Sequence, residues 1–463
     1  QASHAPFRQK PYAPFSSAWW LILSLGWAML SLISCTPQNE TPAVVQPPSG
    51  TPQNYEALEE TVGATQSAPV PVTATPEPLI TTPSGITLTM WTTEAFSPLQ
   101  DDAGSELLKQ QIEGFSAENP DIEVEFTLKK AYGKGGISDF LQTTGAVIPA
   151  QLPDLAILDI QELPEVAGAG ILRPLDGLIS QQLRSDLFPF TVEACMVDQQ
   201  LMGIQFEADL IHLVYDTELL KPPPTTWTDV LSGTTQYAFP AGGDLNNRVN
   251  DAFWLQYLAL QDAPLDLGDE PTLNRQDVGE ILAFWREGFN RGVIPPTVQD
   301  YRTMADAWSA YLRGTVGMVN TNSLLYLNNR AQLRHAAFGQ VPTRDRKLSS
   351  LATGWALVIV ATDQARQKAG AKLIDWLMRP ENNGSWTYAT HRVPTTRQAF
   401  NSWDVSDPYV RFLQQLAEVA RPHPAGPSYD FVAETLQRAV HDMFSGSASP
   451  GEAVDAAITA IEK

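Results

Sequence analysis

The sequence predicts an α/β protein with two lobes, and three observations lead to this prediction. From Ile86 onward, segments with the alternating pattern of a strand take turns with segments whose apolar residues recur at helical spacing. Strands that alternate with helices are typical of βαβ units and of parallel sheets. Residues 86–463 also exceed what a single hydrophobic core usually serves, so the chain should divide into two lobes.

The first half of this region alternates regularly between the two patterns. Strands are predicted at 86–91, 121–128 and 153–160. Helices are predicted at 105–119, 139–147 and 161–176, the last of which runs into a loop. The first helix should end at Asn119, because the residue before a proline disfavours helical backbone.

The second half is richer in helices, since five segments carry an apolar stripe at i, i+3, i+4 and i+7 spacing. These helices are predicted at 251–260, 278–289, 304–314, 365–378 and 452–463. Short strands are predicted between them at 211–216, 237–241, 315–321, 336–342 and 355–361.

The formal net charge is −22, with 30 basic against 52 acidic side chains. Binding to nucleic acid needs a basic face, so this balance argues against a nucleic-acid partner. It suits a soluble domain outside the cytoplasm.

The first 34 residues have the pattern of a secretory signal peptide. Arg8 and Lys10 provide a basic start, and the stretch from Ala18 to Ile33 is almost wholly apolar. This stretch is shorter than the roughly 20 apolar residues of a stable spanning helix. We therefore expect export, with residues 1–34 removed.

Cys35 follows this apolar stretch directly. The sequence Leu32-Ile33-Ser34-Cys35 resembles the bacterial lipobox, in which the cysteine becomes the lipidated first residue of the mature protein. We therefore expect attachment to the cell membrane through a lipid anchor, facing the extracytoplasmic space. With Cys35 lipidated, Cys195 has no cysteine with which to pair, and it is most simply a buried apolar residue.

Residues 36–85 are rich in proline, threonine, glutamine and serine and contain no lysine or arginine. Such a segment cannot bury enough apolar surface to order itself. Together with the lipidated cysteine we interpret 35–85 as a disordered tether, with a reach of roughly 40 Å.

The motifs of common enzyme classes are not found. The chain contains no Gly-x-Ser-x-Gly, and its six histidines show no His-x-x-x-His spacing. The stretch "AYGKGGISDF" lacks the spacing of a phosphate-binding loop, so a surface loop between a strand and a helix is the simpler interpretation. We expect no catalytic residues, no metal and no cofactor.

Six segments in a fixed order resemble one known family. They are "FSAENPDIEVEF" (115–126), "PDLAILDIQELPEVAGAGILRPLD" (153–176), "LMGIQFEADLIHLVYDTELLKPPPTTWTDVL" (201–231), "AWSAYLRGTVGMVNTNS" (307–323), "KAGAKLIDWLMRPENNGSW" (368–386) and "VPTTRQAF" (393–400). Their order and spacing resemble the family 1 extracellular solute-binding proteins, which include maltose-binding protein. The resemblance covers nearly all of the chain from Ile86 to Lys463.

The resemblance implies a two-lobed periplasmic-binding-protein-like fold (type II) with a ligand cleft between the lobes. It implies that a monomer captures a solute, most often a sugar or oligosaccharide, and delivers it to an ABC-type permease. Lobe 1 is then expected at 86–207 and 351–400, and lobe 2 at 208–350 and 401–463.

Eleven residues at strand ends and on loops are candidates for ligand binding. They are Thr93, Glu94, Asp159, Glu207, Asp209, Asp244, Asn247, Arg248, Asn322, Trp355 and Tyr429. The resemblance places Asp209 at a cleft carboxylate and Trp355 in an aromatic loop at the cleft. Carboxylates can accept hydrogen bonds from sugar hydroxyls, and aromatic faces can pack on the C–H surface of a sugar ring.

Other functions stay open at this point. A glycerol phosphate, a polyamine or another solute would suit the same kind of cleft. An extracellular glycosidase would need two carboxylates at a set separation.

Overall fold

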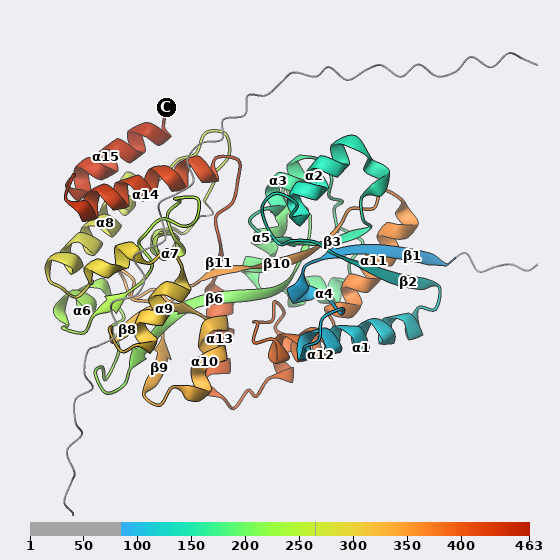
Figure 1. Cartoon of the computed structure of the whole chain (residues 1–463), viewed down its shortest axis with the longest axis horizontal. Helices are drawn as coiled ribbons and strands as arrows, with labels where there is room; N and C mark the ends of the chain where they lie inside the picture. The colour runs from blue at the N-terminus through green and yellow to red at the C-terminus, as the bar shows by residue number, and fades with distance from the viewer. Residues whose placement is uncertain (1–84, 264) are drawn as a thin grey trace, which may run out of the picture. The chain divides into compact units, whose positions relative to one another are not determined.

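A computed structural model describes residues 85–263 and 265–463 (Figure 1). Its central feature is a mixed sheet with the strand order β2-β1-β3-β10-β6-β8-β7, in which β11 lies beside β10 and β9 beside β6. One sheet path therefore connects strands from early, middle and late parts of the chain.

The strands at one end of this path are parallel. β1 (Ile86–Thr92) lies between β2 (Ile122–Leu128) and β3 (Leu155–Asp159) and runs in the same direction as both. The helices α1 (Ala103–Glu118) and α2 (Ile137–Val147) connect these strands, as the alternating pattern predicts.

The centre of the sheet is antiparallel, which the strand pattern did not predict. β10 (Leu351–Ile359) is antiparallel to both β3 and β6 (Ile204–Asp216). β6 is also antiparallel to β8 (Met318–Asn322) and β9 (Ala336–Gly339).

Helices lie on both sides of the sheet (Figure 1). The remaining helices are α3 (Leu163–Gly168), α4 (Gln181–Asp186), α5 (Pro189–Cys195), α6 (Trp227–Ser232), α7 (Asp251–Leu260), α8 (Arg275–Asn290), α9 (Met304–Leu312), α10 (Ser323–Asn329), α11 (Gln364–Leu377), α12 (Pro380–Ala389), α13 (Pro408–Val419), α14 (Tyr429–Ser445) and α15 (Pro450–Ile461). The remaining strands are β4 (Met196–Val197), β5 (Gln200–Leu201), β7 (Tyr237–Ala238) and β11 (Arg421–Pro422). Short 3-10 helices are η1 (Glu94–Phe96), η2 (Pro149–Gln151), η3 (Pro296–Asp300), η4 (Arg330–Gln332) and η5 (Gln398–Ser402).

Three helices of the second half begin at capping boxes. In α6, α9 and α15 the N-cap hydroxyl of Thr226, Thr303 or Ser449 accepts a hydrogen bond from the backbone N–H three residues later, and the acidic side chain of that later residue accepts one from the N-cap backbone N–H. These reciprocal bonds satisfy backbone donors that the first turn leaves open, so the sequence itself fixes where these helices start.

The described residues contain two hydrophobic cores. One draws on residues 88–206 and 355–386 and includes Phe115 and Leu158. The other draws on residues 188–352 and 393–461 and includes Trp254 and Leu436. Each core is large enough to stabilise its own layer of helices and strands, because the hydrophobic effect grows with the apolar area buried.

The chain passes from one core to the other on segments that hydrogen-bond to one another. On β6 the change falls between Phe206 and Ala208, and on β10 between Ala352 and Trp355. Since β6 and β10 carry the chain across in opposite directions, they pair antiparallel. A third segment joins them where Ala208 and Val393 each donate a backbone hydrogen bond to the other at 2.9 Å.

Gly354 lies at this crossing, opposite Ala208 of β6. Its φ is 153°, and a Cβ at this position would lie 2.2 Å from the backbone oxygen of Glu207. The two crossing strands can therefore approach this closely only because residue 354 has no side chain.

The expected signal peptide, the lipidated Cys35 and almost all of the tether lie outside the described residues. Within the described residues, no helix combines the length and the apolar character needed to cross a membrane.

We predict that Gly354→Ala destabilises the protein by about 2–4 kcal/mol, since it combines an unfavourable φ with a clash against backbone. Gly168→Ala is the matched control, because nothing lies within 4 Å of the Cβ that it adds. Urea unfolding of both variants gives the comparison, and equal stability of the two would contradict the close approach at the crossing.

Candidate functional site

Three of the predicted site residues form one row across the crossing strands. Trp355 of β10 pairs with Asp159 of β3 on one side and with Glu207 of β6 on the other. Thr353 and Asp209 form the pair two residues further along the same two strands. Because directly paired residues point to the same face of a sheet, all five side chains belong to one face.

The Asp159 carboxylate is nearly buried, with 6% of the residue exposed. The Tyr132 hydroxyl donates to its Oδ2 at 2.6 Å, and the backbone N–H of Gln161 donates to its Oδ1 at 2.9 Å. Burial raises the pKa of Asp159, although these two hydrogen bonds act in the opposite direction. The carboxylate is thus oriented by two donors and still has lone pairs for a ligand.

Glu207 is more deeply buried, with 1% of the residue exposed. The Arg392 guanidinium lies 3.1 Å from its Oε2, but neither carboxylate oxygen accepts a hydrogen bond of good geometry. Burial raises the pKa of Glu207 to about 7, against the lowering effect of Arg392. Arg392 also lies over the ring of Phe96, with 4.9 Å from its guanidinium carbon to the ring centroid.

Asp209 is held by the start of α10. Its Oδ1 accepts a hydrogen bond from the Ser323 hydroxyl at 2.6 Å and another from the backbone N–H of Leu324 at 3.0 Å. Burial raises the pKa of Asp209. Because both bonds use Oδ1, Oδ2 is the oxygen left for a solute hydroxyl.

Trp355 belongs to an aromatic group beside the carboxylates. The centroid of its ring lies 5.4 Å from that of Phe96 and 5.4 Å from that of Tyr132. Only 9% of Trp355 is exposed, so these neighbours cover most of its ring.

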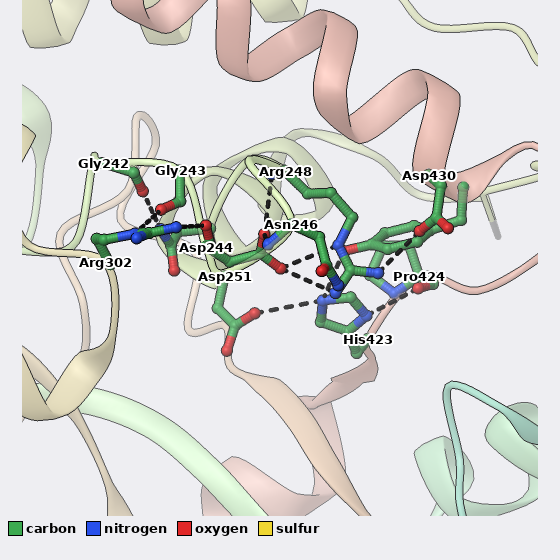
Figure 2. A network of polar contacts seen from close by, with 12 residues as sticks. Gly242, Gly243, Asp244, Asn246, Arg248, Asp251, Arg302, His423, Pro424 and Asp430 are labelled. Carbon is green, nitrogen blue, oxygen red and sulfur yellow. Dashed lines mark hydrogen bonds and ion pairs between the residues drawn. The ribbon is translucent and has the colours of Figure 1, made fainter. Parts of the chain in front are cut away.

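A second group of predicted and unpredicted residues surrounds His423 (Figure 2). His423 Nδ1 lies 2.7 Å from the Pro424 carbonyl oxygen, and Nε2 lies 3.2 Å from Asp251 Oδ1. Asp251 is the first residue of α7. The Tyr429 hydroxyl lies 3.4 Å from the same Nε2, and burial raises the pKa of this phenol.

Arg248 connects this group to the loop before α7 (Figure 2). It donates to Asp244 Oδ2 at 2.9 Å and to Asp430 Oδ1 at 2.8 Å, and it lies over the Tyr429 ring. Arg302 donates to the backbone oxygen of Asp244. Asp244 and Arg248 therefore form an ion pair with one another, and each also has a hydrogen-bond partner elsewhere in the chain.

The two groups act on one another electrostatically. Burial is the main influence on the pKa of Asp159; the electrostatic interaction with His423 acts to lower this pKa, and that with Asp251 acts to raise it. Asp251 also raises the pKa of Asp209. Asp159 ends β3, which packs in one core, whereas Asp251 begins α7, which packs in the other, so groups from both parts influence the same carboxylate.

The other predicted residues lie on loops and at helix ends. Thr93 is buried and precedes η1, in which Glu94 is exposed. Asn247 has a positive φ of 60° in the loop before α7. The Asn322 side chain accepts a hydrogen bond from the backbone N–H of Leu325 at 2.9 Å and so caps α10.

The sequence analysis missed five residues of this region. They are Tyr132, Glu162, Asp251, Arg392 and His423. Burial raises the pKa of Glu162 to about 7, and the charge of Asp159 adds to this effect. Tyr132 had a sequence signal, because it follows a predicted strand and directly precedes a glycine-rich stretch that is typical of a turn.

This arrangement provides groups that can bind a polar solute. It offers carboxylate acceptors, aromatic rings and one guanidinium around a common point. In residues 85–263 and 265–463, no three histidine, cysteine, aspartate or glutamate side chains are grouped as they would be to hold a metal ion.

Comparison with known proteins shows the family to which the chain belongs. Residues 110–410 match the family described as bacterial extracellular solute-binding protein. The chain belongs to this family. Among curated relatives, this solute-binding protein is 20% identical over 359 residues to a binding protein of Brucella abortus, covering 73% of this chain and 84% of the relative. It is also 24% identical over 220 residues to the maltotriose-binding protein of Pyrococcus abyssi, covering 45% and 44%.

Solved structures identify the fold of this solute-binding protein. The cyclic α-maltosyl-1,6-maltose binding protein of Arthrobacter globiformis superposes with a TM-score of 0.66 at 18% identity, covering 82% of this chain and 98% of that one. The sugar-binding protein MalE of Xanthomonas citri gives a TM-score of 0.64 at 19% identity, covering 81% and 96%. The two-lobed α/β fold predicted from the sequence is thereby confirmed.

Glu207 gives this solute-binding protein a testable pH dependence. Since its folded pKa of about 7 lies above its ordinary 4.5, the folded state keeps the proton to higher pH than the unfolded state. The contribution of this group to stability is therefore full below pH 4.5 and is lost as the pH rises through 7, by up to about 3 kcal/mol.

Glu207→Gln should remove this loss, so that its stability changes less than that of the wild type between pH 5 and pH 8. Glu193→Gln is the control, since Glu193 is also paired with an arginine but is a third exposed. Urea unfolding at both pH values measures the slopes, and a Glu207→Gln slope equal to that of the wild type would contradict the buried-carboxylate interpretation.

Proposed function

We propose that this solute-binding protein captures a carbohydrate at the crossing of β6 and β10 and delivers it to an ABC-type permease. The observation that carries the proposal is the row of Asp159, Trp355 and Glu207, with Asp209 beside it on the same face. A sugar presents hydroxyl donors at its rim and C–H groups on its faces. Carboxylates and aromatic rings side by side are the complementary surface.

The comparisons support a carbohydrate as the solute class. Four of the similar proteins carry names or titles that mention maltotriose, cyclic maltosyl-maltose, maltose or maltotetraose. Identities below 25% leave the solute of this chain to be decided by its own side chains.

The lobes that close on the solute are those expected from the sequence, with 86–207 and 351–400 as lobe 1 and 208–350 and 401–463 as lobe 2. The change of core between Phe206 and Ala208 and the pairing of β6 with β10 support the boundary at 207, whereas Val393 and Phe400 pack in the core of lobe 2. Hinge closure around a ligand at such a crossing is a common mode of motion in two-lobed binding proteins.

One observation favours a second solute class. Five carboxylates gather around the crossing, on Asp159, Glu162, Glu207, Asp209 and Asp251. The guanidinium of Arg392 is paired with Glu207, and the ring of His423 lies 3.2 Å from Asp251. A polyamine would supply the missing positive charge.

A thermal-shift screen of the purified protein against neutral sugars, phosphosugars and polyamines tests the proposal. A solute at 100 times its dissociation constant adds about 2.7 kcal/mol to stability, which raises the melting temperature measurably. We expect neutral sugars to give the shift. A shift with polyamines alone would favour the second class.

With a responding sugar, Asp209→Ala should weaken binding about five- to 150-fold, because one buried hydrogen-bond partner contributes roughly 1–3 kcal/mol. Trp355→Ala should weaken it at least as much, because aromatic residues dominate such sites. Asp262→Ala is the control, since the Asp262 side chain is fully exposed and pairs only with Lys347. Calorimetric titration decides this, and unchanged affinity in both site variants would remove the assignment.

Cys35 is proposed to carry the lipid, after removal of residues 1–34, with 35–85 as the tether to the membrane. Cys35→Ala should move the protein from the membrane fraction to the soluble fraction. Cys195→Ala should leave it at the membrane, since Cys195 is wholly buried in a core. Membrane attachment of the Cys35→Ala protein after signal cleavage would contradict the lipid anchor.

A further inference from the structure

Tyr132 lies on a turn between β2 and α2 that is held by hydrogen bonds among its own residues. Gly133 and Gly135 have φ values of 71° and 82°, which favour glycine. Gly136 donates a backbone hydrogen bond to the Gly133 oxygen at 2.8 Å, and the Gly135 N–H donates to Asp139 Oδ2 at 2.7 Å. A Cβ on Gly136 would lie 2.8 Å from the Tyr132 carbonyl carbon. The glycines therefore fix where this tyrosine is placed.

Tyr132 covers two of the residues that the sequence predicted as ligand contacts. Its hydroxyl donates to Asp159 at 2.6 Å, and its ring lies 5.4 Å from that of Trp355. Asp159 is 6% exposed and Trp355 is 9% exposed, whereas Tyr132 is 56% exposed. Of these three side chains, a solute that enters from solvent meets Tyr132 first.

The direction of the Tyr132 hydrogen bond limits what a solute can present. A phenol has a single hydroxyl proton, and Tyr132 uses it for the hydrogen bond that it donates to Asp159. The hydroxyl oxygen can therefore only accept a hydrogen bond from a solute. The charged groups that act on it are the carboxylates of Asp159, Glu162 and Glu207, which also repel an anion. Burial and these charges raise the pKa of Tyr132, so its proton stays in place.

Building on the proposed carbohydrate function, we propose that Tyr132 is a specificity-determining contact that admits sugars with hydroxyl or amino donors and rejects sugar phosphates and sugar acids. In this arrangement the Tyr132 ring packs on the sugar beside Trp355, and the hydrogen bond to Asp159 positions Tyr132. The acceptor-only hydroxyl then takes a hydrogen bond from the sugar, whereas a phosphate or carboxylate group at this position brings no donor and meets like charge.

The test titrates the purified protein with maltotriose, cellotriose and chitotriose, and with the aldonic acid of each, in which the reducing end becomes a carboxylate. For a trisaccharide that binds, we expect its acid to bind at least 10-fold more weakly. Tyr132→Phe keeps the ring and should weaken the neutral sugar about five-fold, and Tyr132→Ala should weaken it 10-fold or more. Tyr388→Phe and Tyr388→Ala are the controls, because Tyr388 is also 56% exposed but its ring packs on Trp403.

The outcomes separate this inference from the proposed function. Binding of a neutral trisaccharide with unchanged affinity in both Tyr132 variants, or equal binding of its acid, would overturn the role of Tyr132 and leave carbohydrate binding in place. Binding of none of the six compounds by the wild type would contradict the proposed function and this inference together. A loss of affinity in Tyr132→Ala that is accompanied by a lower melting temperature, with normal affinity in Tyr132→Phe, would show a structural role only.

Discussion

The close approach of β10 to β6 at Gly354 is the constraint on which the rest of the structure depends. The strands can pair there only because residue 354 has no side chain, since a Cβ at this position would clash with the backbone of Glu207. This pairing carries the chain from one hydrophobic core to the other in both directions. It also brings Asp159, Trp355 and Glu207 into one row, so the same contact that joins the cores creates the surface on which a solute can bind.

The electrostatics of the site follow from where this row lies. Carboxylates at the junction of two cores lose hydration, and burial is the largest influence on the pKa of Asp159, Glu207 and Asp209. Two of these carboxylates are stabilised chiefly by neutral donors, from Tyr132 and Ser323. Such groups gain most from additional hydrogen-bond donors, which the hydroxyls of a sugar provide.

The sequence allowed the fold class and most elements to be predicted, because apolar periodicity reports local structure and the order of motifs resembled one family. It did not reveal that β10 separates β3 from β6, since strand pairing over more than a hundred residues leaves no local pattern. For the same reason Arg392 and His423 were missed, as each becomes relevant only through a partner far away in the chain. Glu207 and Asp209 could be placed on one face from the sequence because side chains alternate along a strand, whereas Asp159 and Trp355 were proposed from the resemblance to the family.

Hydrogen exchange measured by mass spectrometry, with and without the sugar that gives the largest thermal shift, tests the central claim most directly. A solute held at the crossing should slow exchange in peptides covering 130–137, 203–212 and 350–357, and leave α8 and α15 unchanged. Protection confined to peptides away from β6 and β10, with exchange at the crossing unaltered at saturating sugar, would contradict the account.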